Sequence, residues 1–301
     1  MNIAILSRNS KLYSTQRLVE VATLRGHNAI VLNHTKCYVE IEKNKNTIHY
    51  QGIELAKIDA IIPRIGASVT AYGCAIVRQF ETMSVFSVNT SQAIVRSRDK
   101  LRSMQLLSSK GIDIPKTAFA RENKDVSDLI EMVGTLPIII KVLEGTQGLG
   151  VILADTHKAA KSVIEAFYDI GTNILIQEFV REANGTDIRA FVVNGKVVGA
   201  IRRIAKDGEF RSNLHRGGRS EMITLNKKEK ETAIKATAAL GLSVAGVDML
   251  PSLRGPLVLE VNSSPGLKGI ESATQKNIAV QIIKYIEDNA KGKPQKDKIG
   301  V

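Results

Sequence analysis

Two apolar stretches near the C-terminus constrain the fold most strongly, because each carries oxygen-bearing side chains inside a hydrophobic run. Residues 247–250 and 257–262 have the pattern of two strands joined by a short turn. Side chains alternate across a strand, so Glu260 and Asn262 project from the same face. If the two strands pair as a hairpin, Asp248 joins them on that face.

These three side chains predict a site for a hard divalent cation. Carboxylate and amide oxygens suit Mg²⁺ or Mn²⁺ and suit zinc poorly. Ionised carboxylates in a buried sheet are unfavourable unless they are paired or bound to a metal. The alternative is a glutamate at a strand end in an ordinary salt bridge, and the hairpin alone leaves both interpretations open.

The chain is large enough for more than one domain and has the composition of a globular protein. It has 301 residues, of which 44% are hydrophobic and 24% charged. No stretch approaches the ~20 apolar residues that span a bilayer, and the first strand is too short for a signal peptide. Cys37 and Cys74 are too few for a zinc site or a disulfide framework. We therefore expect a cytoplasmic protein with no membrane partner.

The strongly basic character of the chain predicts anionic partners. The net charge is +12 and the sequence pI is about 9.6, a field that attracts phosphates, nucleic acid or acidic proteins. Part of the excess lies in a tail at residues 291–301, which we expect to be mobile. Aromatic residues make up only 4% of the chain, which disfavours base-stacking platforms for single-stranded nucleic acid.

The N-terminal third alternates between strand and helix patterns. Strands are predicted at 3–6, 29–32 and 60–62, and helices at 13–25 and 73–83. Such alternation is typical of a parallel α/β sheet. The first strand is not followed by G-x-G-x-x-G, so a dinucleotide-binding domain has no support.

The remaining chain is rich in strands. Residues 96–104 open a predicted helix that stops at Gly111, and Asn194–Gly195 is a strong hairpin signal. Further strands are predicted at 138–143, 150–153, 174–179, 188–193 and 197–202, with a helix at 156–167.

A lysine and a glycine-rich turn form a candidate phosphate site. Lys141 lies in an otherwise apolar strand, and Gly145, Gly148 and Gly150 follow it directly. Glycines let backbone N–H groups approach phosphate oxygens closely. The turn is not a Walker loop, because G-K-[ST] is missing and a strand follows it. A plain glycine hairpin beside a snorkelling lysine is the alternative.

Two acidic residues at strand ends are candidate nucleoside ligands. Glu178, together with the backbone of Phe179 and Val180, can bond an adenine edge or a ribose. Asp187 begins the next strand and is either a cap or a ribose ligand. A solvated strand-end glutamate is the commoner situation.

Cationic side chains provide candidate anion contacts. Arginine forks match carboxylate and phosphate oxygens, although a solvated basic loop is the alternative. His215 is a candidate base, but a lone histidine in a loop usually has no catalytic role. The cationic and polar candidates are Arg64, Lys100, Arg202, Arg203, Arg211, Ser212 and Asn213.

The order of these parts resembles the ATP-grasp superfamily, over residues 98–287. More closely, the chain resembles the RimK type, the ribosomal protein S-six glutamate ligases, nearly from end to end. The segments that carry this likeness are 1–8, 62–66, 98–107, 210–218 and 246–248.

The resemblance implies an α+β ATP-grasp fold behind an N-terminal parallel α/β domain. The implied domains are 1–97 (the α/β domain), 98–180 (a small lid subdomain), 181–290 (the core with the metal site) and 291–301 (the basic tail). It also implies a homotetramer.

The resemblance further implies a role for each candidate residue. Lys141 holds the α- and β-phosphates, and the loop at 145–150 closes over them. The remaining implied contacts are Glu178, Phe179 and Val180 to adenine, Asp187 to the nucleoside, Arg211, Ser212 and Asn213 to the γ-phosphate and the acyl phosphate, and Asp248, Glu260 and Asn262 to two Mg²⁺ or Mn²⁺ ions, with Glu260 bridging.

The implied reaction is ATP-dependent addition of L-glutamate to the C-terminal glutamate of a small-subunit ribosomal protein, with poly-glutamate synthesis a further possibility. Residue type and neighbourhood suggest four contacts to substrate carboxylates, namely Arg64, Lys100, Arg202 and Arg203. The alternatives are an ATP-grasp ligase acting on another carboxylate, and a nucleotide-gated ribosome- or RNA-binding protein. No DNA partner is expected.

Overall fold

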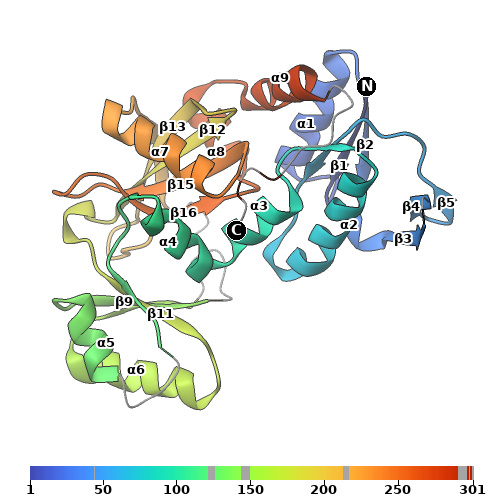
Figure 1. Cartoon of the computed structure of the whole chain (residues 1–301). Helices are drawn as coiled ribbons and strands as arrows, with labels where there is room; N and C mark the ends of the chain where they lie inside the picture. Colours follow the sequence, from blue (N-terminus) through green and yellow to red (C-terminus); the bar gives the residue numbers. More distant parts are fainter. Residues whose placement is uncertain are drawn as a thin grey trace.

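A parallel α/β unit opens the chain, as the alternating pattern predicts (Figure 1). The computed structural model describes residues 1–43, 45–120, 126–143, 150–212 and 217–290, together with residues 297 and 299. The first sheet is wholly parallel and has the order β2-β1-β6-β7. Its strands are β1 (Asn2–Leu6), β2 (Asn28–Leu32), β6 (Ala60–Pro63) and β7 (Phe86–Ser87).

Helices cover both faces of this sheet, which explains why β1 is apolar throughout its buried length. Helix α1 (Tyr13–Leu24) packs on the face that carries Ile3 and Ile5. Helix α2 (Thr70–Thr82) packs on the opposite face, with Ala4. The predicted strands and helices of this unit are confirmed, with ends that shift by a few residues.

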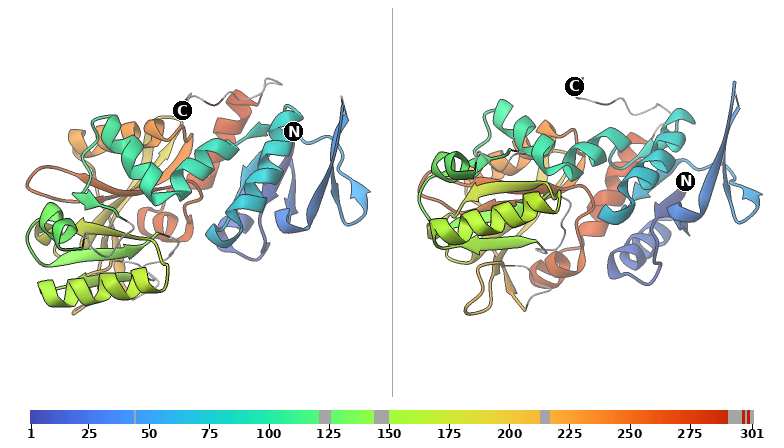
Figure 2. Two further views of the ribbon diagram at one scale, coloured as in Figure 1. Left: turned by 60° about the horizontal axis from the view of Figure 1, so that its bottom comes forward. Right: turned by 90° about the horizontal axis from the view of Figure 1, so that it is seen from below.

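A small antiparallel sheet, for which the sequence pattern gave no prediction, stands between β2 and β6 in the chain. It consists of β3 (Cys37–Glu42), β4 (Lys45–Tyr50) and β5 (Ile53–Glu54). Figure 2 shows it standing out from the α/β unit on the side away from the rest of the protein. Most side chains of β3 and β5 are exposed, so these strands lack the alternation of buried and exposed residues by which strands are predicted.

The single helix predicted to begin at residues 96–104 is wrong, because the structure has two helices there. Helix α3 (Ser91–Arg98) ends at Asp99, and α4 (Lys100–Ser109) begins directly after it. Asp99 has an extended backbone, and its carboxylate accepts a hydrogen bond from the Arg102 N–H at 2.9 Å. An aspartate in this position caps the second helix and stops the first.

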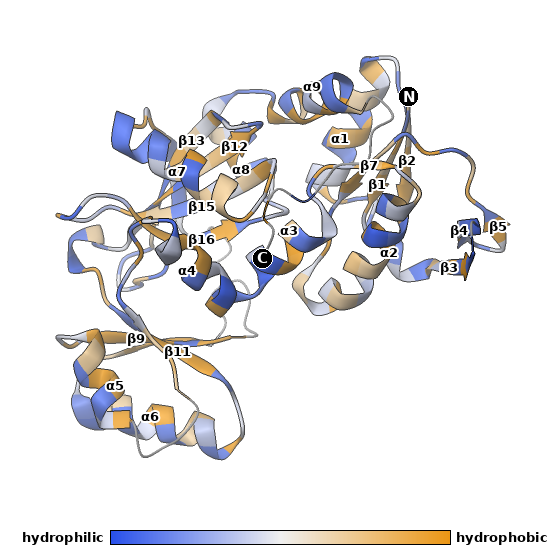
Figure 3. Cartoon of the chain, in the orientation of Figure 1, coloured by the Kyte–Doolittle hydropathy of each residue, from blue (hydrophilic) through white to orange (hydrophobic). Residues whose placement is uncertain are grey.

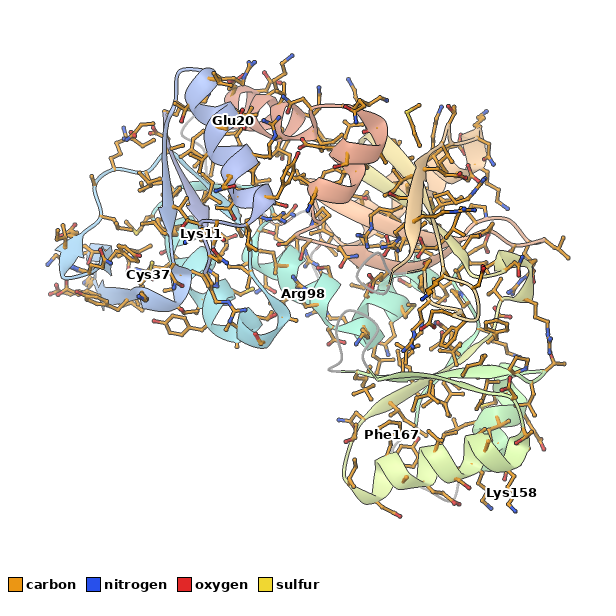
Figure 4. The ribbon with its side chains drawn as sticks, turned by 180° about the vertical axis from the view of Figure 1, so that it is seen from behind. Lys11, Glu20, Cys37, Arg98, Lys158 and Phe167 are labelled. Carbon is orange, nitrogen blue, oxygen red and sulfur yellow. The ribbon has the colours of Figure 1, made fainter. Side chains whose placement is uncertain are left out.

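The next unit is an antiparallel sheet with two helices, drawn at the bottom of Figure 1. The sheet order is β10-β9-β11-β8. Figure 4 labels Phe167 and Lys158 on α6, where Phe167 contacts this unit's own core and Lys158 is exposed. The elements are β8 (Thr117–Ala118), α5 (Val126–Val133), β9 (Ile138–Val142), β10 (Val151–Ala154), α6 (His157–Asp169) and β11 (Ile174–Glu178).

A larger antiparallel sheet with the order β14-β13-β12-β15-β16 forms the centre of the protein. The predicted hairpin at Asn194–Gly195 is confirmed, and both residues have the positive φ that this tight turn requires. The elements of this unit are β12 (Thr186–Val193), β13 (Lys196–Ile204), β14 (Arg219–Met222), α7 (Lys227–Ala239), β15 (Val244–Leu250), β16 (Leu257–Asn262), α8 (Lys268–Thr274) and α9 (Ile278–Asn289). Short 3-10 helices are η1 (His34–Lys36), η2 (Ala67–Val69) and η4 (Arg181–Ala183).

The first and last units share one hydrophobic core. Ile3 of β1, Phe191 of β12 and Ile283 of α9 belong to the same buried cluster. Figure 3 shows the hydrophobic strands inside, while the outer face of α7 is hydrophilic. Among the described helices, none combines the length and apolar character that crossing a bilayer requires.

Candidate active site

A row of charged side chains crosses the central sheet. The strand register sets Arg203 of β13 opposite Asp187 of β12, and Arg189 of β12 opposite Asp248 of β15. Asp248 in turn lies opposite Glu260 of β16. Asp187 and Arg189 are two residues apart and therefore share a face. The register thus collects positive and negative groups from four strands on one surface of the sheet.

Two arginines hold the two buried aspartates of this row. Arg203 donates to both oxygens of Asp187, at 2.6 and 2.5 Å, and to Asp248 at 2.8 Å. Arg189 donates a hydrogen bond to each carboxylate oxygen of Asp248, at 2.6 and 2.5 Å. Burial raises the pKa of Asp248, but Arg189 and Arg203 outweigh this effect and lower it to about 2. The two arginines therefore favour the ionised form of Asp248, the form that a metal ligand requires.

Glu260 and Asn262 complete the predicted metal-binding face. The predicted hairpin is confirmed, and the Asn262 amide donates to Glu260 at 2.8 Å. Desolvation by the surrounding protein, followed by the charge of the nearby Asp248, raises the pKa of Glu260 although half of its side chain is exposed, and the two carboxyl groups are in hydrogen-bonding contact. Two carboxylates in contact need a shared proton or a shared cation. This donor set of two carboxylates and one amide oxygen fits Mg²⁺ or Mn²⁺.

Lys141 reaches toward this face from β9. Its ammonium donates to the Gln177 side chain at 2.5 Å. Burial lowers the pKa of Lys141 to about 8, with Glu260 acting to raise it and Lys100 to lower it. A lysine desolvated in this way binds an anion strongly when protonated, because little water must be displaced.

Lys100 supports the end of β9. It donates to the backbone carbonyls of Val142 and Leu143, at 2.9 and 2.6 Å. The structure thus places Lys100 beside Lys141 and fastens the strand from which the glycine-rich turn departs. Gly145 and Gly148 lie outside the described residues, whereas Gly150 has a φ of +69° and lies against Val142.

The predicted adenine-binding segment ends β11. The Glu178 carboxylate accepts from the Lys116 backbone N–H at 2.7 Å and pairs with Arg254. The Phe179 ring meets the Phe210 ring edge-on, with centroids 6.4 Å apart. The side chain of Glu178 is thus engaged within the protein, and Phe179 forms an apolar contact to the loop that follows β13.

That loop also carries Arg211 and Ser212. The guanidinium of Arg211 lies 5.1 Å from the Phe210 ring, bonds Glu209 and reaches the Val151 carbonyl at 3.3 Å. Ser212 donates to Asp187 at 2.6 Å. Asn213 and His215 lie outside the described residues. Arg211 therefore links this loop to β10, the strand that follows the glycine-rich turn.

The four predicted substrate cations are not brought together. Arg202 pairs with Glu221 on an exposed surface at 3.0 Å, while Arg203 is buried between its aspartates. Arg64 lies elsewhere and donates to the Pro265 carbonyl at 2.8 Å. Arg203 has its guanidinium committed to Asp187 and Asp248, so the structure favours a role in positioning these carboxylates.

Sequence reasoning missed several partners of the site. Arg189 was detectable, because it lies two residues from Asp187 and therefore on the same strand face. Gln177 likewise occupies a buried strand position next to Glu178, where an amide needs a partner. Arg254 carries no local signal, because it lies in a loop that meets Glu178 only in the folded chain. Glu209 lies two residues from Arg211, so their pairing was detectable from the sequence.

The fold is that of the ATP-grasp ligases. The chain is similar to the ATP-grasp ligase PsnB complexed with minimal precursor, with a TM-score of 0.75 and 19% identity over 95% of this chain and 98% of that one. It is also similar to the RimK domain protein ATP-grasp from Sphaerobacter thermophilus, with a TM-score of 0.74 and 19% identity over 95% and 99%. At such identities the likeness concerns the fold alone.

Sequence comparisons narrow this class to a family. Residues 1–94 match the RimK PreATP-grasp domain, and residues 97–286 match the RimK-like ATP-grasp domain. A probable alpha-L-glutamate ligase of Hydrogenovibrio crunogenus is 58% identical over 97% of both chains. A probable alpha-L-glutamate ligase of Aeromonas salmonicida is 59% identical over 98% of this chain and 99% of the relative. The chain therefore belongs to the RimK-like ATP-grasp family, which confirms the resemblance, and it is an enzyme of the ligase class.

Proposed function

We propose that this enzyme is an ATP-dependent carboxylate–amine ligase that adds L-glutamate to the C-terminal glutamate of a small-subunit ribosomal protein. The observation that carries the proposal is the contact between Asp248 and Glu260, opposite each other on β15 and β16. The half-buried Lys141 faces the same region from β9. Relatives at 57% to 59% identity are named probable alpha-L-glutamate ligases, which supports glutamate as the substrate.

The acidic face is the proposed holder of two Mg²⁺ or Mn²⁺ ions. Asp248, Glu260 and Asn262 would hold them through their carboxylate and amide oxygens. When bound, these ions offset the repulsion between a carboxylate and the triphosphate. Arg189 and Arg203 keep Asp248 ionised and fix its orientation. These hydrogen bonds prepare Asp248 as a metal ligand.

Nucleotide binding is assigned to the lid sheet and to the loop after β13. Lys141 holds the α- and β-phosphates, and the turn with Gly145, Gly148 and Gly150 covers them. Adenine lies against the segment that begins with Glu178 and Phe179. The loop contributes Arg211, Ser212 and Asn213 to the γ-phosphate, and Asp187 fixes the Ser212 hydroxyl at 2.6 Å.

The reaction proceeds in two steps. An oxygen of the acceptor carboxylate attacks the γ-phosphorus of ATP, so that ADP leaves and an acyl phosphate forms. The amine nitrogen of glutamate then attacks the acyl carbon, phosphate leaves and an amide bond forms. The guanidinium of Arg211, next to β10, stabilises the charge that moves onto the transferred phosphoryl group. Closure of the small sheet excludes water from the acyl phosphate.

The proposed setting is the cytoplasm, with a homotetrameric enzyme and an acidic peptide tail as acceptor. PsnB, which shares the fold, has been solved with a precursor peptide and, separately, with minimal precursor, Mg and ADP. The D-alanine–D-alanine ligase of Bacillus anthracis also shares the fold, with a TM-score of 0.66 and 19% identity over 96% of this chain and 97% of that one. Ligation of another carboxylate acceptor is therefore the second candidate.

Intact-mass spectrometry tests the proposal. The ribosomal acceptor is incubated with the enzyme, ATP, Mg²⁺ and L-glutamate, and a ladder of glutamyl increments is expected. Glu260→Ala removes the ladder, whereas Glu221→Ala, which removes an exposed glutamate of β14, retains it. ADP release only with other acceptors discards the ribosomal substrate and keeps the ligase. ATP binding without ADP release from any acceptor rejects the ligase.

A further inference from the structure

The N-terminal unit has a pocket at the carboxyl ends of its parallel strands. From β1 the chain continues to β2 on one side, and β6 lies on the other side of β1. The loops that follow β1 and β6 therefore diverge, and ligands of open α/β sheets bind in such a crevice. A pocket of about 410 Å³ lies here, and it is lined by Ser7, Arg8, Asn9, Leu12, Arg64 and Gly66.

Two guanidiniums line this pocket, and a third lies next to its Arg64 loop. Arg8 and Arg64 line it, and Arg98 of α3 donates to the carbonyl of Ile65, between Arg64 and Gly66, at 2.7 Å. Figure 4 labels Arg98 at the junction between the N-terminal unit and the rest of the protein. A Cβ on Gly66 would lie 3.3 Å from the Arg8 Nη2 atom. Glycine at this position thus leaves the guanidinium of Arg8 room against the loop of Arg64.

The positive charge of this cluster is not neutralised within the described part of the chain. No carboxylate there forms an ion pair with Arg8, Arg64 or Arg98. The Nε atom of Arg98 is buried and has no hydrogen-bond partner among the same residues. Burial, and after it the like charge of Arg98, lower the pKa of Arg64 to about 10. Uncompensated guanidiniums beside a pocket indicate an anionic ligand.

The helix beside the pocket adds to this field. Helix α1 begins at Tyr13, directly after Leu12, and has neither a side-chain cap nor an acidic residue in its first turn. The partial positive charge of its N-terminus is therefore not offset by its own sequence. It reinforces the preference of the three arginines for an anion.

The pocket is fastened to the metal-binding hairpin. Arg64 donates to the Pro265 carbonyl at 2.8 Å, and the Ser264 hydroxyl donates to the Pro63 carbonyl at 3.1 Å. Ser264 and Pro265 follow Asn262 by two and three positions in the chain. A ligand in the pocket is consequently held in a fixed relation to the end of β16.

The charge of Glu260 acts on cationic side chains in two different parts of the protein. The charge of Glu260 raises the pKa of Lys141 on one side and that of Arg98 on the other, in both cases against the effect of burial. Lys141 belongs to the lid sheet and Arg98 to α3. Glu260 is therefore an electrostatic neighbour of both Lys141 and Arg98.

We propose that Arg8, Arg64 and Arg98 form a specificity pocket for a carboxylate of a glutamyl substrate that is not itself activated. This inference rests on the ligase function proposed above. The pocket volume is in the lower part of the range of small-ligand sites, which suits one glutamyl group and excludes a folded domain. The carboxylate belongs either to free L-glutamate or to the glutamate-terminated acceptor tail, and both present the same chemistry to the arginines.

Isothermal titration calorimetry on the full chain, with Mg²⁺ and a non-hydrolysable ATP analogue, tests the pocket. The two probes are L-glutamate and a synthetic peptide that ends in glutamate. Arg8 is exposed, so Arg8→Ala is expected to fold, and we expect it to weaken binding of one probe at least tenfold. Arg78→Ala, which removes an exposed arginine of α2 in the same unit, is the matched control and changes binding less than twofold. The probe that is affected identifies the source of the carboxylate.

A second variant tests whether the position of the Arg8 guanidinium, and not only the net charge of the pocket, determines binding. Gly66→Ala keeps all three charges and adds a methyl group against the Arg8 guanidinium, so it is expected to weaken the same probe as Arg8→Ala does. Unchanged affinity of both probes in Arg8→Ala, or no binding of either probe to the wild type, overturns the proposal. Binding that depends on Arg8 in an enzyme that forms no glutamyl ladder retains the pocket and rejects only the proposed reaction.

Discussion

Asp248 and Glu260 lie directly opposite each other on β15 and β16, with their carboxyl groups in hydrogen-bonding contact. Arginines neutralise Asp248 from the side of β12 and β13. Glu260 lies at the edge of that support, with an oxygen 3.9 Å from the Arg189 guanidinium, and its side chain is 51% exposed. We therefore expect a bound cation to meet one firmly held carboxylate and one accessible carboxylate.

Neutralising Glu260 should lower the activity of the enzyme without lowering its thermal stability. Glu260→Gln removes the contact between two carboxyl groups, so we expect the metal-free variant to melt no lower than the wild type. Turnover should fall at least ~100-fold, because a proposed metal ligand is lost. Thermal melts with ADP, with and without Mg²⁺, provide the measurement: saturating ligand at about 100 times its Kd stabilises the wild type by about 2.7 kcal/mol and the variant much less. Equal Mg²⁺ stabilisation of both proteins would contradict a metal-ligand role for Glu260.

Removing Arg203 should destabilise the fold. Its side chain is 6% exposed and joins Asp187 to Asp248. Loss of one member of such a buried network leaves unpaired carboxylates and costs about 3–5 kcal/mol in the free energy of unfolding. Urea unfolding of Arg203→Ala measures this loss, and Arg202→Ala, at the neighbouring exposed position, should change the free energy by less than about 0.5 kcal/mol. A stable Arg203→Ala enzyme with only its KM for glutamate raised would instead indicate direct substrate contact.

Nucleotide affinity should depend on pH through Lys141. Burial lowers the pKa of this lysine to about 8, so the free enzyme loses the positive charge as the pH rises through 8. Bound phosphates favour the protonated form, and affinity should therefore weaken up to about tenfold per pH unit above that value. Calorimetric titration of an ATP analogue at several pH values measures the effect. Lys141→Arg stays protonated throughout and serves as the control. A flat profile for the wild type would contradict the assignment.

The folding stability of the N-terminal unit should decrease at acidic pH because of His34. This side chain is fully buried, and within the described residues its ring nitrogens have no hydrogen-bond partner. Burial, followed by the charge of Arg8, lowers its pKa to about 4. The unfolded chain binds a proton below its ordinary pKa near 6.5, while the folded chain does not. Stability is therefore lost as the pH falls from about 6.5 to 4, by up to about 1.4 kcal/mol per unit.

Urea unfolding at pH 7, 6 and 5 checks this prediction. The difference in unfolding free energy between the wild type and His34→Leu isolates the histidine from the other titrating groups. The difference should shift in favour of His34→Leu as the pH falls. A difference that stays constant over this range would show that His34 is protonated in the folded protein.

Local patterns identified the parts of the site that one strand or turn defines. Alternation on β16 placed Glu260 and Asn262 on one face, and Asn194–Gly195 marked a hairpin. The helix break at Asp99 escaped the sequence analysis, because the polar residues 96–100 are compatible with a continuous helix and the backbone geometry at Asp99 shows the cap. The three-stranded sheet between β2 and β6 was not predicted either. Most side chains of β3 and β5 are exposed, so these strands do not alternate between buried and exposed positions.

The sequence by itself determined most helices and strands of the larger sheets and the family, and it predicted the metal-binding face of β16 and the lysine-and-glycine phosphate motif. These are properties of neighbouring residues, set by backbone periodicity and turn chemistry. Only the tertiary structure decided that Arg203 joins Asp187 to Asp248, that α9 packs into the N-terminal core, and that Arg64 bonds Pro265 across 201 residues. The physical reason is that periodicity fixes which face a side chain occupies, whereas sheet order and register decide which charge from a distant segment it meets.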